Sequence, residues 1–306
     1  MSKPLVPIVV SYSELDAFRQ CPHKHELAYK QRWAPDRVGP ALNTGRIWHE
    51  VMAIHYGCLM SGTTDHERLA FVADHLMTIE ESDPETAALV AWMYDGYVEC
   101  YGDDPDWEIV GVEDQRLIRL PTVAGRPSRF WLRMRVDMLV RERNIKSPKL
   151  WVVDHKSGRN LPNDRELDID DQFGLYTWGL RQLGTPVFGS VYSAARTQRN
   201  KVEPQTIPDR FARIRLYRAD PELDEIAREA YVTARTAYAY GTGRNPAPRA
   251  PDTDRCRWRC PFTEPCLMGR KAGSFAETRF LQDGGFTQQT EAQHLADRGY
   301  PEPLRP

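Results

Sequence analysis

Apolar and polar residues alternate along two stretches in the middle of the chain, a period-two pattern that predicts β-strands. The first, 129–142, reads RFWLRMRVDMLVRE, and the second, 149–156, reads KLWVVDHK. Further strands are expected over 107–120, 187–195 and 210–218. Together with the helices around them, these strands predict an α/β protein with a mixed sheet flanked by helices.

Helical patterns dominate the first third of the chain. Ser11 and Glu14 have the spacing of a capping box, ahead of a helix that we expect to be interrupted near Pro22. Helices follow, after an APDRVGPALN loop, over 44–60, 65–81 and 84–101, and later in the chain over 164–183 and 221–241, the last with Gly241 as its C-cap.

The pattern divides the chain into four segments with different expected structures. They are an N-terminal helical region (1–105), a sheet-containing core (106–243), a cysteine-rich loop that packs back on the N-terminal helix (244–270) and a polar tail of helix fragment and loose chain (271–306).

Composition limits the classes of partner. The chain has 306 residues, 41% hydrophobic content and a formal charge of −2, so it can bury a large core but is not a uniformly basic nucleic-acid coat. Contact with phosphate would have to be local, at the arginine-rich patches 126–143, 196–199, 210–218 and 244–259. No segment is long and apolar enough to span a membrane, and the opening MSKPLVPIVV is too short for a signal peptide, which predicts a cytoplasmic protein.

The strand pair carries a set of residues suited to phosphodiester hydrolysis. Asp154 and Lys156 are two apart, so they share one face of a strand and His155 lies on the other. With Asp137 from the neighbouring strand, two carboxylates could hold a divalent cation, beside an ammonium that orients water or stabilises developing charge. An acid two residues before a lysine is expected about once by chance in a chain of this composition, so an Asp–Lys pair at an exposed strand end remains an alternative.

Three other positions are weaker candidates when taken alone. His49 lies four residues after Gly45 on one helix face, where a histidine is more often a core residue than a ligand. Gln172 and Tyr176 are also four apart and could contact DNA or form a packing edge. Glu113 could approach the carboxylates, although an exposed strand glutamate is the simpler expectation.

Cys256, Cys260 and Cys266 fall within eleven residues, in a segment too short for a core of its own. Three thiolates imply a fourth ligand, for which Cys21 is the candidate, and such sulfur sites hold zinc or an iron–sulfur cluster. The link would close a loop of about 235 residues, at an entropic cost of roughly 5 kcal/mol before the constant term. Zinc held by the four cysteines, or by three of them and His23, is the competing interpretation.

Taken in order, six motifs resemble the RecB-type branch of the PD-(D/E)xK nucleases that carry an iron–sulfur cluster, such as the CRISPR-adaptation nucleases and the AddB-type helicase–nuclease subunits. The resemblance covers residues 11 to 267. It rests on SYSELDAFRQCP, GRIWH, VD, VVDHKSGR, DQFGLY and CRWRCPFTEPC. It implies a restriction-endonuclease-like mixed sheet, with an N-terminal helical region and a C-terminal cysteine-rich iron–sulfur loop.

The resemblance also implies a role for each motif residue. His49, Asp137, Asp154 and the backbone carbonyl of His155 would bind Mg²⁺ or Mn²⁺, with Asp137, Asp154 and Lys156 as the catalytic set. Gln172 and Tyr176 would lie beside the active site and contact DNA. The four cysteines (Cys21, Cys256, Cys260 and Cys266) would hold a [4Fe–4S] cluster.

The sequence therefore predicts a metal-dependent DNA exonuclease that acts on single-stranded or frayed ends. A structure-specific endonuclease with the same site is one alternative. A catalytically silent DNA-binding partner in a recombination complex is another, although the complete catalytic set argues against it. Other recombination or repair proteins are conceivable partners.

Overall fold

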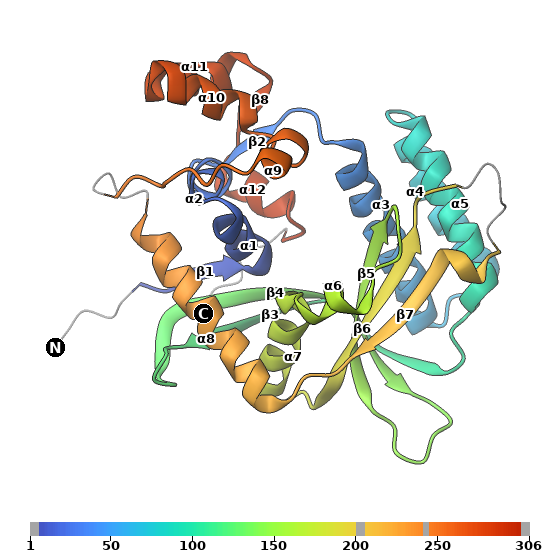
Figure 1. The fold of residues 1–306 in the computed structure, drawn as a ribbon. Helices are drawn as coiled ribbons and strands as arrows, with labels where there is room; N and C mark the ends of the chain where they lie inside the picture. Colours follow the sequence, from blue (N-terminus) through green and yellow to red (C-terminus); the bar gives the residue numbers. More distant parts are fainter. Residues whose placement is uncertain (1–5, 200–205, 241–244, 301–306) are drawn as a thin grey trace. The chain divides into compact units, whose positions relative to one another are not determined.

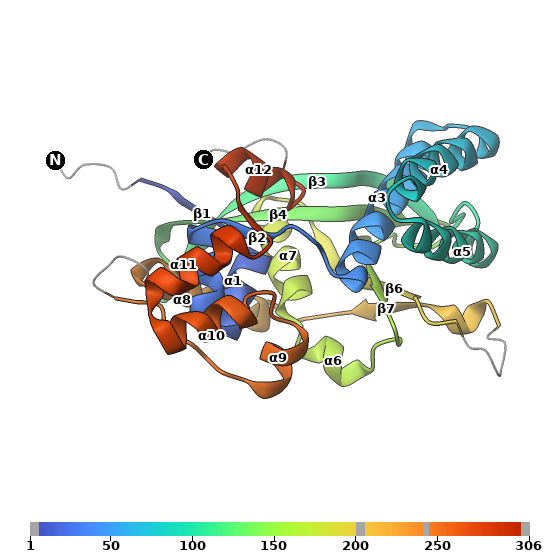
Figure 2. The ribbon, with the colours of Figure 1, turned by 90° about the horizontal axis from the view of Figure 1, so that it is seen from above.

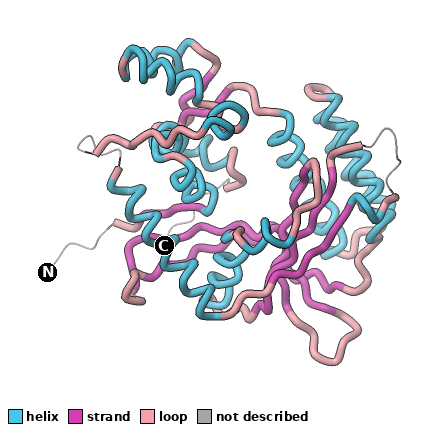
Figure 3. Tube along the Cα trace, viewed as in Figure 1, coloured by secondary structure: helices cyan, strands magenta, loops and turns pink. Residues whose placement is uncertain are grey.

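The computed structural model describes residues 6–199, 206–240 and 245–300, which form two compact units. Unit 1 comprises the chain up to Val38, Leu117–Met134 and the chain from Ala227 onward. Unit 2 comprises Gly39–Arg116 and Arg135–Ile226. The expected helices and strands are labelled in Figure 1, and Figure 3 distinguishes them by colour.

The six-stranded sheet is mixed, as the sequence predicted. Its order is β1-β4-β5-β6-β7, with β3 paired to β4. The β4–β5 and β6–β7 pairs are antiparallel, whereas β1–β4 and β5–β6 are parallel. The strands are β1 (Ile8–Ser11), β3 (Trp107–Pro121), β4 (Pro127–Glu142), β5 (Leu150–Gly158), β6 (Val187–Arg196) and β7 (Phe211–Leu216).

In unit 2, helices cover both faces of the sheet (Figures 1 and 2). On one face, α3 (Pro40–Ser61), α4 (Asp65–Glu80) and α5 (Pro84–Tyr101) bury a large apolar core against strand residues such as Val153 and Val191. On the other face lies α7 (Asp171–Gln182), where Thr177 is 2.8 Å from Ser190 between their hydroxyl oxygens. Because alternate strand residues face opposite ways, Ser190 and Val191 point to the two different layers.

Two helices of unit 2 differ from the expected bounds. The helix α3 begins at Pro40, inside the expected loop, because proline fits the first turn of a helix. The helix expected over 164–183 is divided into α6 (Asp164–Asp168) and α7. Asp170 ends the gap as the N-cap of α7 and accepts a hydrogen bond from the Gln172 amide, 2.9 Å away.

Unit 1 begins with β1 and the capped helix α1 (Tyr12–Gln20), in which Ser11 Oγ accepts from the Glu14 amide at 3.2 Å. The predicted interruption at Pro22 is present: α1 ends at Cys21, and α2 (Pro22–His25) and a π-helical turn η1 (Glu26–Lys30) follow. Most of the long helix α8 (Asp220–Ala239) lies in this unit, and its expected C-cap, Gly241, is outside the described residues.

The end of unit 1 has more regular structure than its sequence suggested. The cysteine-rich segment, expected to be a loop, forms α9 (Thr253–Trp258) and α10 (Thr263–Ala272). The polar tail, expected to be a helix fragment and loose chain, forms α11 (Ser274–Asp283), β8 (Phe286–Gln288) and α12 (Glu291–Ala296). The strand β8 pairs antiparallel with β2 (Trp33–Pro35), and Leu281 and Phe262 are buried with Trp33 in a small core. This polar segment is ordered because its few apolar residues meet partners from the N-terminal region, which local sequence pattern does not reveal.

Candidate active site

The β4–β5 hairpin places the two predicted carboxylates next to each other. In the hairpin register Met138 pairs with Val153, so Asp137 and Asp154 are the next residues on their strands. The hydrogen-bonded pairing ends there, and the Asp137 side chain accepts the His155 backbone N–H at 2.8 Å. Asp137 is therefore held at the point where the two strands part.

Asp154 is bound by side chains from its own strand and from α7. Its Oδ2 lies 2.7 Å from Lys156 Nζ, and its Oδ1 accepts from Gln172 Nε2 at 3.1 Å. Lys156 Nζ also donates to Gln172 Oε1 at 3.1 Å. The side-chain amide of Gln172 thus fixes the lysine and the carboxylate relative to each other.

His49, from α3, completes the group on the Asp137 side. Its Nδ1 lies 2.9 Å from Asp137 Oδ2. Burial lowers the histidine pKa, but the facing carboxylate outweighs it and raises the pKa of His49 above its usual value. Burial raises the pKa of Asp137, but the contact with His49 outweighs it and holds this pKa well below its usual range.

Asp154 has the opposite behaviour. Burial, together with the nearby Asp137 carboxylate, raises the pKa of Asp154 to about 6 despite the Lys156 charge. Lys156 keeps its proton because its carboxylate neighbours, Asp154 first, raise its pKa against burial. Two neighbouring carboxylates with opposed pKa shifts and a charged lysine form a site suited to binding a cation or handling protons.

His155 and Tyr176 point into the packed interior. The His155 ring is on the strand face opposite Asp154, as predicted, and stacks on Tyr56 with ring centroids 5.4 Å apart. Burial lowers the pKa of His155 to about 3, so its ring is neutral. Tyr176 is buried on α7, one turn after Gln172. The contribution of Gln172 and Tyr176 to DNA contact stays a prediction.

Glu113 differs from the exposed strand glutamate that the sequence favoured. It is half-buried, forms an ion pair with Arg135, and has a backbone φ of +53°, which is unusual for a residue other than glycine. Burial raises its pKa, and the Asp137 charge raises it further. Glu113 therefore belongs to the electrostatic surroundings of the site, although a single glutamate in an alternating strand gives no sequence signal for this.

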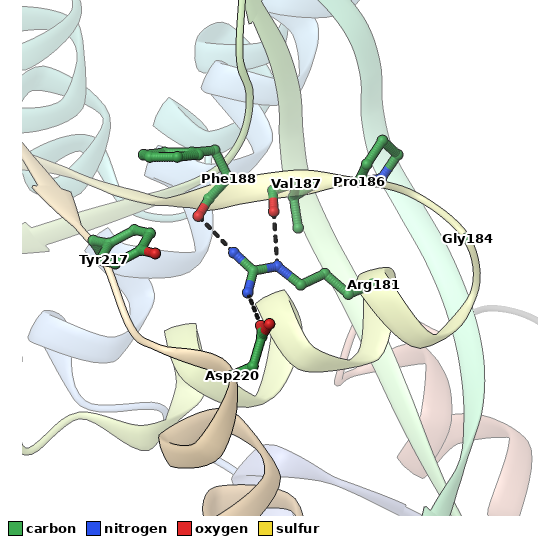
Figure 4. A pocket seen from close by; sticks show the side chains of 7 residues that line it. All are labelled: Arg181, Gly184, Pro186, Val187, Phe188, Tyr217 and Asp220. Atoms are coloured by element: carbon green, nitrogen blue, oxygen red, sulfur yellow. Dashed lines mark hydrogen bonds and ion pairs between the residues drawn. The ribbon is translucent and has the colours of Figure 1, made fainter.

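An open depression lies at a different place in unit 2, between the end of α7, β6 and β7 (Figure 4). It has a volume of about 470 Å³ and none of the predicted site residues line it. Arg181 fills its floor and donates to the carbonyl oxygens of Val187 and Phe188, at 2.9 and 2.7 Å. Because these bonds join α7 to β6, we assign this arginine a structural role.

The four predicted cluster cysteines all lie in unit 1, half-buried and free of disulfide bonds. Cys21 Sγ accepts from the Ala250 amide at 3.4 Å, and Cys266 Sγ accepts from Arg249 Nε at 3.2 Å. The cysteine-rich segment also contacts the N-terminal helix directly, since Arg255 Nη1 donates to the Gln20 carbonyl at 2.6 Å.

His23 and Glu277 lie beside this cysteine group. His23 Nε2 is 2.7 Å from Glu277 Oε1, and potential ligand atoms of His23, Glu277 and Cys266 are all within 4.8 Å of one another. Among the described residues, no three of the four cysteine sulfurs all lie within 4.8 Å of one another. Burial raises the pKa of Cys260 and Cys266, so both are thiols in the absence of a bound cation.

Comparison with protein families decides the identity of the fold. The sequence model of the PD-(D/E)XK nuclease superfamily matches residues 9–267, from β1 to α10. The chain belongs to this superfamily. PD-(D/E)XK nucleases hydrolyse phosphodiester bonds and usually use Mg²⁺ or Mn²⁺, ions that favour oxygen donors such as the carboxylates on β4 and β5.

Two solved structures are distantly similar to this PD-(D/E)XK nuclease. A crystal structure from Eubacterium rectale described as a "Putative exonuclease" has 15% identity and a TM-score of 0.47, covering 81% of this chain and 87% of its own. The crystal structure of SSO0001 has 12% identity and a TM-score of 0.37, covering 86% and 88%. No protein of curated function matches the sequence. In the described part of the nuclease, no helix is long and apolar enough to cross a bilayer.

Proposed function

We propose that the chain is a metal-dependent DNA exonuclease that acts on single strands or frayed ends, of the RecB-type branch with an iron–sulfur cluster. The observation that carries the catalytic part is the hairpin geometry. Asp137 and Asp154 are the first residues beyond the paired part of β4 and β5, with Lys156 and His49 in direct contact with them.

The donor types, imidazole and carboxylate, suit a divalent cation, and among the described residues the ligand atoms of His49, Asp137 and Asp154 are not all within 4.8 Å of one another. Asp154 Oδ2 is buried and lies in an ion pair with Lys156 Nζ at 2.7 Å. A buried carboxylate is costly unless charged partners compensate it, and a bound cation would add such a partner. We assign His49, Asp137, Asp154 and the His155 carbonyl as the residues that would hold Mg²⁺ or Mn²⁺. When bound, the ion would supply Lewis acidity toward the phosphate and lower the pKa of water.

Lys156 acts in this scheme as a proton-bearing cation and not as a base. Its raised pKa keeps the ammonium charged at neutral pH. It can orient a water molecule by donating a hydrogen bond and stabilise negative charge that develops on the phosphate. Gln172 limits the ammonium to one position through the 3.1 Å bond from Lys156 Nζ to its Oε1.

The depth of the carboxylates supports single-stranded or frayed DNA as substrate. The Asp154 and Asp137 side chains are 5% and 10% exposed, whereas His49 and Lys156 are each 28% exposed. A phosphate must therefore enter between the exposed groups to reach the carboxylates. A flexible single strand can present one phosphate in this way more easily than a stiff duplex can.

For the cysteines, we propose that Cys21, Cys256, Cys260 and Cys266 hold a [4Fe–4S] cluster. The four cysteines are free and come from the two ends of unit 1, which supports this proposal. The sulfurs of Cys21 and Cys266 also accept hydrogen bonds from N–H groups, and such bonds stabilise bound thiolates. Zinc is the second candidate, with His23 as a substitute ligand, because His23 lies close to Cys266.

The catalytic proposal is tested by cleavage of end-labelled DNA with and without Mn²⁺. We expect Lys156→Ala to lower the cleavage rate by at least about 10²- to 10⁴-fold, since it removes the charged donor from the site, while the protein stays folded. Lys146→Ala, in the exposed loop of the same hairpin, is the matched control and should cleave normally. Full activity in Lys156→Ala would refute the assignment.

The same assay separates the two modes of cleavage. Circular single-stranded DNA offers no end, so an exonuclease leaves it intact while it degrades a linear strand of the same sequence. Rapid cutting of the circle would identify an endonuclease with the same active-site residues.

The cluster proposal is tested by the absorbance of protein purified without oxygen. We expect a brown protein with visible absorption, and we expect Cys266→Ser to lose the colour and to melt at a lower temperature because metal binding is coupled to folding. Cys100→Ser is the control, since this cysteine lies in unit 2. A colourless protein that contains one zinc ion would favour the second candidate.

A further inference from the structure

A basic and aromatic segment lies between two of the predicted cluster cysteines and has no role in the site described above. It consists of Arg257, Trp258 and Arg259, at the end of α9. The Trp258 side chain is 71% exposed, although tryptophan usually buries most of its large apolar surface. An exposed indole between two arginines therefore requires an explanation.

The backbone that carries this tryptophan is well anchored within unit 1. Asp252 caps α9 by accepting from the Arg255 amide at 2.8 Å, and Arg255 Nη1 donates to the Gln20 carbonyl at 2.6 Å. On the other side, Thr263 Oγ1 donates to the carbonyl oxygen of Cys260 at 3.1 Å. The indole is thus presented from a fixed position, which lowers the entropy cost of binding a partner.

The charges around the indole favour an anionic partner. The Arg257 guanidinium lies 4.7 Å from the centroid of the Trp258 ring, and Arg259 is exposed. Within residues 6–199, 206–240 and 245–300, neither arginine forms an ion pair. Two arginines without an ion-pair partner form a local positive site on a chain of formal charge −2, and the exposed ring beside Arg257 can stack on another ring.

We propose that Arg257, Trp258 and Arg259 form a binding point for single-stranded nucleic acid, with a base stacked on the indole and phosphates on the guanidinium groups. The proposal rests on the proposed nuclease function and specifies its substrate. A base in a duplex is already stacked on its neighbours, whereas a base in a single strand has a free face. The chemistry of the segment therefore favours single strands over duplexes.

The proposed binding point is tested by measuring the equilibrium binding of a fluorescein-labelled oligothymidylate to the full chain. Divalent metal is left out so that cleavage does not interfere. We expect Trp258→Ala to bind about 5- to 100-fold more weakly, the effect of losing one stacked base. Trp258→Phe keeps an aromatic face and should bind within about threefold of the native protein. Replacing both arginines by alanine should reduce the slope of log K against log salt by about 1.4, since each phosphate contact on a single strand contributes about 0.7.

A matched control is available in the same unit. Phe275, on α11, is 78% exposed and forms no ring contact with an arginine in the described structure, so Phe275→Ala should bind normally. If native protein binds and cleaves single strands but Trp258→Ala and the double arginine variant bind equally well, the binding point is refuted while the nuclease function stands. If native protein neither binds nor cleaves DNA, both proposals fail. Equal binding of a blunt duplex would refute the single-strand preference.

Discussion

Unit 2 contains two buried clusters of acidic and basic side chains, which differ in the hydrogen bonds that their carboxylates accept. In the first, Arg213 of β7 donates to both oxygens of Asp104, and its Nη2 also donates to the hydroxyl groups of Tyr56 and Tyr97 at 3.0 and 2.8 Å. Tyr56 donates to Asp104 as well. In the second, Asp154 has one oxygen bound by Gln172, and the other forms an ion pair with Lys156 at 2.7 Å.

The two clusters also differ in what surrounds the positive charge. The Arg213 guanidinium is enclosed by aromatic rings, 3.6 Å from the centroid of Tyr101 and 4.1 Å from that of Trp107. Lys156 is 28% exposed and shares its site with two carboxylates and His49. The first arrangement encloses the ion pair among aromatic side chains, whereas the second leaves the ammonium partly exposed to an incoming ligand.

The difference separates a structural cluster from the candidate catalytic one. A buried ion pair with hydrogen bonds on both carboxylate oxygens rigidifies the interior, and removing one partner leaves an uncompensated charge. Burial and the nearby Asp137 charge make the ionised form of Asp154 costly, as its raised pKa reflects. We therefore expect mutations in the first cluster to change mainly the free energy of unfolding, and mutations in the second to change mainly activity.

The largest stability effect is expected for Arg213→Met, which leaves the Asp104 carboxylate buried without its cation. The free energy of unfolding in urea should fall by about 3–5 kcal/mol. The specific activity of the folded fraction should change little. Adding Asp104→Leu should recover part of the loss, and a variant as stable as the native protein would show that the cluster is not a structural one.

A smaller effect, on activity alone, is expected for Gln172→Ala. The substitution removes the side chain that bonds to both Lys156 and Asp154, so the Mn²⁺-dependent rate or the affinity for Mn²⁺ should fall by about 10- to 100-fold. Its melting temperature should stay close to that of the native protein. Gln182, at the end of the same helix, supplies the control Gln182→Ala. If Gln172→Ala lowered stability without changing the rate, the distinction between the clusters would fail.

The smallest effect concerns pH and a histidine beside the structural cluster. Burial lowers the pKa of His55 to about 3, and the nearby Arg68 and Arg213 charges contribute. Between pH 3 and 6.5 the unfolded chain binds the extra proton, so stability rises with pH across this window and is complete above it. His55 alone should make the protein about 2 kcal/mol less stable at pH 5 than at pH 8.

His55→Phe tests this, because phenylalanine keeps the ring contact with Tyr56 but does not titrate. Urea unfolding at pH 5 and pH 8 measures how much stability each protein loses on acidification. The variant should lose less than the native protein, and the loss that it still shows would come from other groups such as His155. The same pH dependence in both proteins would mean that His55 is protonated in the folded state.

Much of the fold could be read from local pattern. The strand over 129–142, the break at Pro22 and the helices over 65–81 and 84–101 all lie within two residues of their predicted bounds. The two-residue spacing of Asp154 and Lys156 placed both on one strand face, and the structure has them 2.7 Å apart. Such features depend on near neighbours in the chain, which a single sequence contains.

Contacts between distant segments were not predictable in the same way. Arg213 appeared only as one residue of an arginine-rich patch, and the local pattern gave no link to its partner Asp104, more than a hundred positions away. The ordered end of unit 1 was expected to be loose because its few apolar residues show no periodicity. Burial of Leu281 depends on Trp33 and Leu27 from the N-terminal region.

The sequence by itself determined the strand and helix types, the PD-(D/E)XK motif residues and the grouping of three cysteines, because side-chain period and spacing are properties of the local chain. Only the tertiary structure decided which neighbours each charged group has. Asp104 and Asp154 are the same residue type, but Asp104 accepts hydrogen bonds from Arg213 and Tyr56, whereas Asp154 shares its site with a second carboxylate and a partly exposed ammonium. Burial strengthens electrostatic interactions, so this difference in neighbours, invisible along the chain, separates structural from candidate catalytic carboxylates.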